Sequence, residues 1–96
     1  MDITKLEDAL ETYRSIDPTI GAPSMLAFLV IARLRDARPS DVQHRLRVTI
    51  TSAVRNVQYW ESRGYIVREP DPRDARATRL VLTPKGQELY QRLRDI

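Results

Sequence analysis

The chain contains no cysteine and only one histidine, His44. Without cysteine it cannot form disulfides, zinc-thiolate sites or thiol redox sensors, and one histidine cannot assemble a metal site alone. No apolar run approaches the roughly 18 to 20 residues of a membrane-spanning helix, and the acidic N-terminal segment lacks the pattern of a signal peptide. We therefore expect a cytoplasmic protein without metal or other cofactor, in which His44 is a surface histidine rather than a pH switch.

Lysine is also scarce, because Lys5 and Lys85 are the only two and the other 14 cationic residues are arginines. The planar fork of arginine suits phosphate oxygens and guanine edges. The net charge is only +3, yet residues 33–79 hold 11 basic and 6 acidic side chains whereas residues 1–32 hold 2 and 5. A GC-rich genome can account for arginine over lysine, but it does not explain this clustering. The basic middle of the chain favours an anionic partner.

The length and composition are those of one small folded domain over residues 1–96, with 42% hydrophobic and 30% charged residues. Domains of this size bury a modest fraction of their surface, so a leftover apolar face is expected to be covered by a partner chain. The sequence shows no Ser/His/Asp arrangement, no glycine-rich phosphate loop and no carboxylate pair with catalytic spacing. We therefore expect that the protein is not an enzyme.

Apolar periodicity predicts helices at residues 1–17, 24–36, 41–47, 50–63 and 84–96. Ser40 is expected to cap the third helix, and Thr83 the last. The β-branched segments 65–69 and 79–83 predict two antiparallel strands joined by a nine-residue connection, 70–78. A short helix, a tight turn, a second helix and then a two-stranded wing make a winged helix-turn-helix. The expected fold class is thus mainly α with a small β-hairpin wing (α+β).

The stretch from Leu46 to Leu89 resembles the MarR family of bacterial transcription regulators. The family's wing carries an Asp-x-Arg, followed by a strand and a Leu-Thr-x-x-Gly entry to the next helix. This chain has Asp74-Ala75-Arg76, then "ATRLV", then Leu82-Thr83-Pro84-Lys85-Gly86. Upstream, "WESRGYIVR" matches the family's leucine, glutamate, x, basic, glycine, hydrophobic pattern, except that Trp60 replaces the usual leucine. The resemblance implies a winged-helix regulator that dimerises through helices at both termini.

The predicted recognition helix divides into an apolar and a polar face. Ile50, Ala53, Val57 and Trp60 are expected to face the core, and Trp60 and Tyr65 to pack there rather than stack on a ligand. The outward residues are candidates for contacts with base edges or phosphates, namely Thr51, Ser52, Arg55, Asn56 and Tyr59. Flanking candidates for phosphate contacts are Arg45, Arg47 and Thr49. No acidic residue occurs between Asp41 and Glu61 to repel DNA.

The wing carries the second set of candidates. Its prolines stiffen the loop, and an arginine at its tip can enter a narrow minor groove, where the negative potential is enhanced. Arg76 matches the family's wing arginine, Asp74 is expected to orient it, and Arg73 is a second candidate near the tip. Arg68 and Arg79 are expected to contact phosphate or to pair with Glu69. The alternative is that these arginines are merely solvated and balance nearby acidic residues.

The terminal helices, 1–17 and 84–96, carry apolar stripes that are candidates for dimerisation. They comprise Ile3, Leu6, Leu10, Tyr13, Leu89, Leu93 and Ile96. The alternative is that the two helices pack on each other within one chain. Family members usually continue into further C-terminal helices beyond the point corresponding to Ile96, so we expect a smaller or rearranged dimer interface with little room for a small-molecule effector.

These features predict a homodimeric, sequence-specific regulator of transcription, with repression as the expected effect. The recognition helices would enter successive major grooves, the wing arginines would enter flanking minor grooves, and the double-stranded DNA site would be near-palindromic. The alternative is an architectural or protein-interaction winged-helix module with little sequence specificity, because the fold alone permits either.

Overall fold

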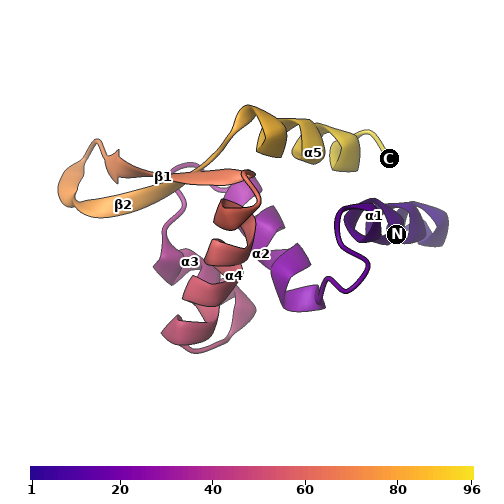
Figure 1. Ribbon diagram of the computed structural model, residues 1–96, viewed down its shortest axis with the longest axis horizontal. Helices are drawn as coiled ribbons and strands as arrows, with labels where there is room; N and C mark the ends of the chain where they lie inside the picture. Colours follow the sequence, from indigo (N-terminus) through magenta and orange to yellow (C-terminus); the bar gives the residue numbers. More distant parts are fainter.

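The structure, a computed structural model that describes all 96 residues, has five helices and one two-stranded antiparallel sheet (Figure 1). The elements are α1 (Ile3–Ile16), α2 (Ala22–Arg33), α3 (Pro39–Leu46), α4 (Ile50–Ser62), β1 (Ile66–Asp71), β2 (Asp74–Leu82) and α5 (Pro84–Arg94). The predicted winged helix-turn-helix is confirmed. No helix combines the length and the apolar composition that a bilayer-spanning helix needs.

Local signals set the helix boundaries. The hydroxyl of Thr49 accepts a hydrogen bond from the Ser52 N–H at the start of α4, and the hydroxyl of Thr83 accepts one from the Gly86 N–H at the start of α5. The prediction that Ser40 caps α3 is wrong. That helix already begins at Pro39, because a proline suits the first turn and holds the preceding residue, the N-cap, in an extended conformation.

The turn between α3 and α4 is as short as the sequence predicts. Arg47 closes α3 in the left-handed region, at φ 57°, and Thr49 then caps α4. This sharp reversal sets α4 across α3, which is the helix-turn-helix arrangement.

The wing is a longer hairpin than the sequence predicts. The strands continue to Asp71 and resume at Asp74, so two residues join them instead of nine. Pro70 pairs with Thr78 while Asp71 pairs with Asp74, and this shift leaves residues 75–77 of β2 without a partner in β1. Prolines and polar residues obscure the strands in the sequence, but Pro70 lies in a two-stranded wing where a missing N–H is tolerated.

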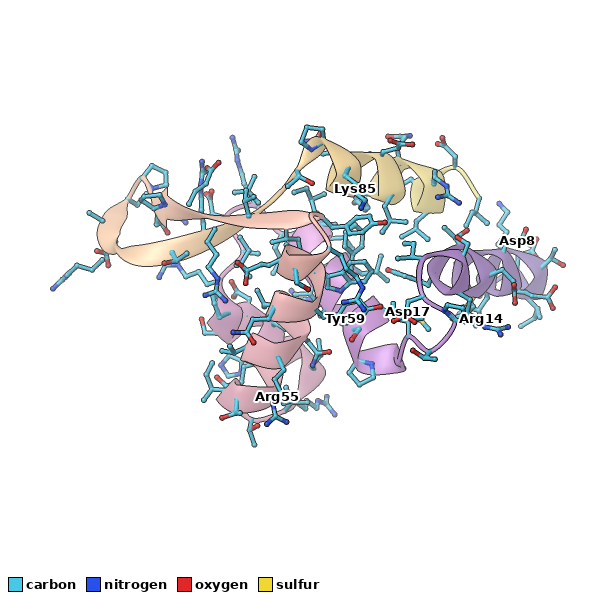
Figure 2. All side chains as sticks on the ribbon, in the orientation of Figure 1. Asp8, Arg14, Asp17, Arg55, Tyr59 and Lys85 are labelled. Atoms are coloured by element: carbon cyan, nitrogen blue, oxygen red, sulfur yellow. The ribbon has the colours of Figure 1, made fainter.

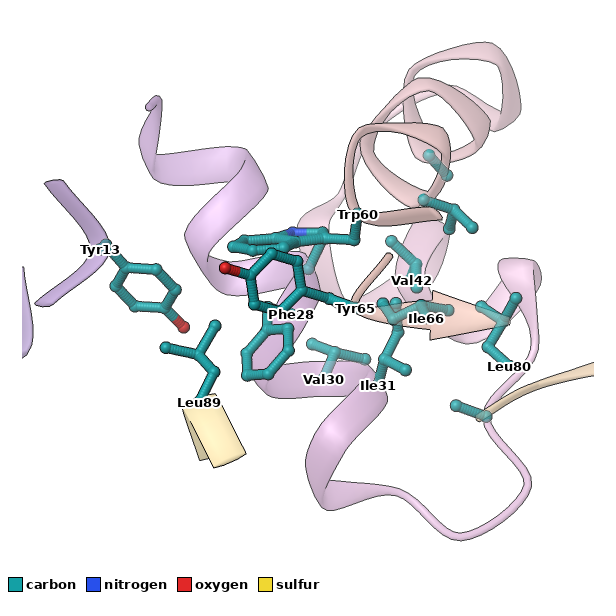
Figure 3. Close-up of a cluster of buried hydrophobic side chains, with 14 residues drawn as sticks. Tyr13, Phe28, Val30, Ile31, Val42, Trp60, Tyr65, Ile66, Leu80 and Leu89 are labelled. Atoms are coloured by element: carbon teal, nitrogen blue, oxygen red, sulfur yellow. The ribbon is translucent and has the colours of Figure 1, made fainter. Parts of the chain in front are cut away.

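An aromatic cluster forms the centre of the core (Figure 3). The rings of Phe28 and Trp60 lie 4.9 Å apart, and Tyr13 and Tyr65 pack against both. The indole N–H of Trp60 donates to the Ser24 carbonyl at 2.7 Å, which satisfies the one polar atom of a fully buried side chain. The predictions that Trp60 and Tyr65 belong to the core are confirmed.

The arrangement of the elements separates two ends of the molecule. The hairpin reaches away from the helices at one end, while α1 and α5 lie together at the other (Figure 1). Between them, α4 packs on α2 and α3, and Leu80 of β2 bonds Ala37 of the α2–α3 loop through a 2.7 Å N–H···O contact. The base of the wing is therefore joined to the helix-turn-helix by the backbone.

Candidate nucleic-acid interface

The recognition helix α4 is fastened to the core along one face. Ala53, Val57 and Trp60 have no exposed surface. They recur at spacings of three and four, which places them on one side of a helix. The prediction that Ile50 shares this buried face is wrong, because 48% of Ile50 is exposed.

The opposite face of α4 presents polar groups to solvent. Thr51, Arg55 and Gln58 are exposed, and Arg55 projects from the far side of the helix in Figure 2. Together with Ile50 and Val54 they line a shallow hollow of about 310 Å³. Arg55 takes part in no ion pair or hydrogen bond with the rest of the chain, so its guanidinium is free for an external acceptor. Gln58 was not among the contact residues predicted from the sequence. It follows Thr51 by seven residues and Arg55 by three, a spacing that places it on the same face of the helix.

Two predicted contact residues point elsewhere. The Asn56 amide donates to the Ser52 carbonyl at 2.9 Å and its oxygen accepts from the Ser24 hydroxyl at 3.0 Å. The Tyr59 hydroxyl donates to Asp17 at 2.7 Å (Figure 2). The prediction that Asn56 and Tyr59 project outward is therefore wrong. Ser52, which shares their side of the helix, is half-buried.

The contact between Tyr59 and Asp17 changes the protonation of both groups. The hydrogen bond from Tyr59 is the main cause that lowers the pKa of Asp17 to about 2, and the nearby Arg63 adds to it. Partial burial is the main cause that raises the pKa of Tyr59 to about 12. This pair therefore ties α4 to the α1–α2 loop as a carboxylate and a neutral phenol near neutral pH.

The turn before α4 adds exposed cations. Arg45, Arg47 and Thr49 are exposed, and neither arginine has an acidic partner within the chain. They lie around the turn that leads into the recognition helix, where a phosphate contact would fix the register of α4 on a duplex.

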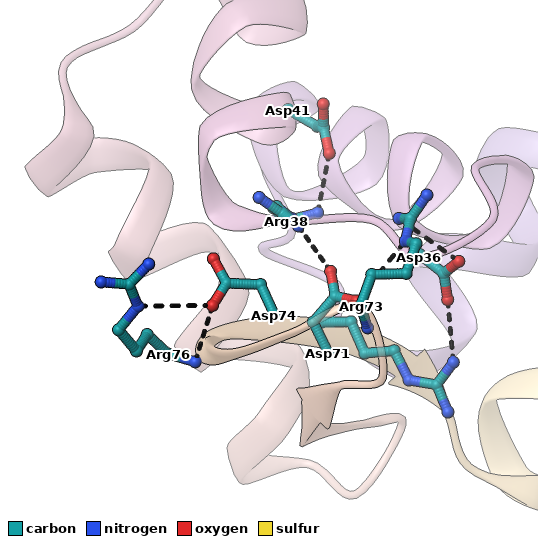
Figure 4. A network of polar contacts seen from close by, with 8 residues as sticks. Asp36, Arg38, Asp41, Asp71, Arg73, Asp74 and Arg76 are labelled. Carbon is teal, nitrogen blue, oxygen red and sulfur yellow. Dashed lines mark hydrogen bonds and ion pairs between the residues drawn. The ribbon is translucent and has the colours of Figure 1, made fainter.

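The wing is anchored by a network of ion pairs (Figure 4). Asp71 is the only charged residue in the core, at 2% exposure. Its carboxylate accepts from the Arg38 guanidinium at 2.6 Å and from the Arg73 backbone N–H at 2.8 Å. These bonds, with the Arg73 N–H first and Arg38 second, lower the pKa of Asp71 below its ordinary value. The buried carboxylate thus links the wing tip to the start of α3.

A second part of the network joins the wing to the α2–α3 loop. Arg79 donates to Asp36 at 2.8 Å and to Glu69 at 3.0 Å, and both bonds raise its pKa. The predicted pair of Arg79 with Glu69 is confirmed. The pairing of Arg68 with Glu69, one of its two predicted roles, is wrong, because Arg68 lies against Glu61 of α4, with its Nε 3.0 Å from both carboxylate oxygens.

The two tip arginines differ in how free they are. Arg73 is 67% exposed, and its guanidinium lies 3.5 Å from both Asp36 and Asp71. Arg76, in the unpaired segment of β2, is 94% exposed and touches only Asp74, whose carboxylate lies 3.5 Å from its Nε and accepts from its backbone N–H at 3.0 Å. Of the two, Arg76 is the more exposed and has fewer acidic partners.

The terminal stripes divide between the core and the surface. Tyr13 and Leu89 are buried within the chain, at 3% and 2% exposure, and so have no surface left for a partner. Leu93 and Ile96 are partly buried. Ile3, Leu6 and Leu10 remain exposed, at 73%, 41% and 42%, along one side of α1.

Close packing explains why the Leu-Thr-x-x-Gly segment ends in glycine, Gly86. A Cβ on Gly86 would overlap the backbone carbonyl of Tyr65, so α5 can pass this close only with glycine there. The Thr83 hydroxyl also donates to the Gly64 carbonyl at 2.6 Å. These contacts set the direction in which α5 leaves the wing.

The family model described as "MarR family" matches residues 20–77 of the chain, which cover α2, the helix-turn-helix and most of the wing. The chain belongs to the MarR family. Its Asp-x-Arg wing segment, Asp74 to Arg76, falls inside that match.

Two relatives extend this assignment. The HTH-type transcriptional regulator PrsX from Escherichia coli is 32% identical over 69 residues, which cover 72% of this chain and 42% of PrsX. The crystal structure of the transcriptional regulator Tm0710 from Thermotoga maritima superposes with a TM-score of 0.72 at 29% identity, over 86% of this chain and 58% of that one. The MarR-family chain thus spans less than two thirds of the length of either relative.

A third similar structure is a mutant of MepR from S. aureus bound to an oligodeoxyribonucleotide. It superposes with a TM-score of 0.77 at 17% identity, over 96% of this chain and 67% of that one. At this identity the likeness demonstrates a shared fold alone.

Proposed function

We propose that this MarR-family chain is a sequence-specific double-stranded DNA-binding regulator that acts as a homodimeric repressor. The observation that carries the proposal is the set of exposed arginines without acidic partners on the helix-turn-helix, Arg45, Arg47 and Arg55, next to a wing that holds Arg76 out at 94% exposure. Most other arginines of the wing and of the α2–α3 loop are occupied by carboxylates.

The outer face of α4 enters the major groove in this proposal. Arg55 bonds guanine and Gln58 bonds adenine, which are the pairings that their donors and acceptors favour. Thr51 contacts a base edge or a phosphate. The Thr49 and Ser52 hydroxyls lie at the start of the helix, where they reach the sugar-phosphate backbone of the DNA. Arg45 and Arg47 contact phosphates and hold the register.

The wing enters the neighbouring minor groove. Arg76 is the contacting side chain, because its guanidinium is nearly free, and Asp74 orients it through the 3.5 Å contact. Arg73 helps in a different way, since it is shared between Asp36 and Asp71 and stabilises the tip on which Arg76 stands. The ion-pair network therefore pre-organises the wing.

The exposed stripe of α1, Ile3, Leu6 and Leu10, forms the dimer contact in this proposal, together with the end of α5. A stripe of this kind is costly to leave in water and suits a self-complementary two-fold interface. Two-fold symmetry then requires a near-palindromic site with half-sites about one helical turn, roughly 34 Å, apart.

The test is selection of bound duplexes from a random DNA pool by the purified chain, with the molar mass of the complex measured by light scattering. We expect an enriched inverted repeat that carries two copies of the chain. Enrichment of a single half-site by one copy would refute the dimer. Retention that depends steeply on salt but not on sequence, or no retention at all, would replace the regulator with an architectural or protein-binding module.

A further inference from the structure

An apolar side chain stands where the proposed interface is otherwise polar. Ile50 is the first residue of α4, and 48% of it is exposed. Val54, one turn further along, is partly exposed on the same side. The two line the hollow of about 310 Å³ whose other walls are Thr51, Arg55 and Gln58.

Neither folding nor helix formation explains this isoleucine. Ala53 and Val57 fill the buried face of α4 without it, and both are fully buried. A β-branched residue is a poorer helix former than alanine or an unbranched side chain. Ile50 therefore leaves apolar surface in water at no evident benefit to the isolated chain.

The charges around the hollow indicate its occupant. Arg55 forms part of its wall, Arg45 lies in the last turn of α3, and Arg47 lies in the turn between α3 and α4. No acidic residue occurs between Asp41 and Glu61, so the surroundings of Ile50 complement a polyanion. The exposed apolar stripe on α1, by contrast, lies at the end of the molecule opposite the wing (Figure 1).

We propose that Ile50 and Val54 contact the C5-methyl group of a thymine in the major groove, beside the base that Arg55 bonds. The thymine methyl is the one apolar group on the major-groove edges of the four base pairs, so it is the partner that an apolar hollow between hydrogen-bonding side chains selects. The N-terminal part of a recognition helix is the part that reaches base edges, which is where Ile50 and Val54 lie. This inference rests on the proposed DNA-binding function and adds a specificity to it.

The experiment replaces thymine by deoxyuridine, one position at a time, in the duplex obtained by selection. Deoxyuridine keeps the hydrogen-bonding edge of thymine and removes only the methyl group. One buried methyl is worth about 0.8 kcal/mol, so we expect the dissociation constant to rise about fourfold per half-site at one symmetric position and by little elsewhere.

The variant Ile50→Ala connects this penalty to the hollow. We expect it to bind the thymine duplex more weakly than the unmodified protein does. The ratio of its dissociation constants for the uracil and thymine duplexes, which we call the uracil penalty, should fall toward one. The matched control is Leu26→Ala, which truncates another half-exposed apolar side chain, on α2 at 46% exposure, outside the hollow. That variant should keep the full uracil penalty. Circular dichroism of both variants verifies that each is folded.

The outcomes separate this inference from the function on which it rests. Sequence-specific binding with no uracil effect at any position overturns the thymine contact and leaves the regulator intact. A uracil penalty that is unchanged in Ile50→Ala overturns the role of the hollow. Absence of sequence-specific binding overturns both.

Discussion

The recognition helix and the wing are held in place by different forces. The helix α4 is fixed by apolar side chains, since Ala53, Val57 and Trp60 are completely buried. The outer part of the wing is fixed by ions, with Asp71 bonded to Arg38 and with Arg79 shared between Asp36 and Glu69. Apolar burial is not screened by ions and does not titrate, whereas ion pairs weaken with salt and with protonation of the carboxylate. The helix α4 is thus held rigidly by packing, whereas the position of the outer wing depends on charge.

Removing the centre of the apolar part is expected to have the largest effect. Trp60→Ala deletes a fully buried ring that touches Tyr13, Phe28 and Tyr65, and should lower the free energy of unfolding by about 3 to 5 kcal/mol. A small domain has about that much stability, so the variant should be largely unfolded. Urea unfolding followed by circular dichroism measures this loss. Tryptophan fluorescence cannot be used, because the variant removes the only tryptophan. A loss below 1 kcal/mol would contradict this role of the ring.

Removing the charge at the wing tip should weaken DNA binding without unfolding the protein. Arg76→Ala is expected to cost about 1 to 3 kcal/mol of binding free energy, because it deletes the proposed minor-groove contact. The matched control is Arg92→Ala on α5, which also removes one exposed positive charge but lies away from the wing and α4. Fluorescence anisotropy at fixed moderate salt compares the two. Equal losses in both variants would reduce the role of Arg76 to general charge.

Removing the buried carboxylate should make the wing, and not α4, lose its order. The pKa of Asp71 is lowered in the folded state, so its stabilisation is complete above the unfolded pKa of about 3.9 and is lost as the pH falls through the lower folded value. Asp71→Asn should therefore lose less unfolding free energy than the unmodified protein between pH 6 and pH 2.5.

Hydrogen exchange at pH 6 locates the effect of that substitution. Exchange in Asp71→Asn should speed up in the hairpin and stay slow in α4, and Arg38→Gln, which removes the other partner, should behave in the same way. Faster exchange throughout the chain would show that the carboxylate supports the whole core.

The smallest effect is expected at the tie between α4 and the α1–α2 loop. Tyr59→Phe deletes the hydrogen bond that is the main cause of the low pKa of Asp17, so this pKa should rise from about 2 toward the ordinary value of about 3.9. An NMR titration of the Asp17 carboxyl carbon measures the change, with Tyr90→Phe as the control. DNA affinity should change less than twofold, because the Tyr59 hydroxyl points into the chain. A tenfold loss would restore Tyr59 as a DNA contact.

Patterns of neighbouring residues allowed much of the fold to be predicted. Thr83 is a cap, Pro84 suits a first turn, and apolar residues recur along each helix, so the order of the elements follows from short-range chemistry. The strands were harder to predict. Their outer halves contain Pro70, Asp71 and Asp74, which are turn residues by composition. They nevertheless lie in the strands, where Pro70 pairs with Thr78 and Asp71 with Asp74, and Arg38 neutralises the Asp71 carboxylate.

The candidate site was predicted less completely than the fold. The rotation of α4 about its axis was uncertain by one residue in the sequence. As a result Asn56 and Tyr59, which bond to other elements, were predicted as contacts, and the exposed Gln58 was not. The partners of the arginines were similarly hidden, since Arg68 lies against Glu61 and Arg79 against Asp36, 43 positions away. Which cation is free depends on where every acid lies, and spacing along the chain does not contain that information.

The sequence by itself determined the family, the winged helix-turn-helix and the presence of a basic surface, because periodicity, caps and the Asp-x-Arg segment are local. Only the tertiary structure decided which side chains remain available: Arg55 and Arg76 are free, Arg38 and Arg79 are neutralised, and Ile50 lies on the surface. The physical reason is that burial and ion pairing depend on distances between elements, and those distances exist only once α2, α4 and the wing have packed together.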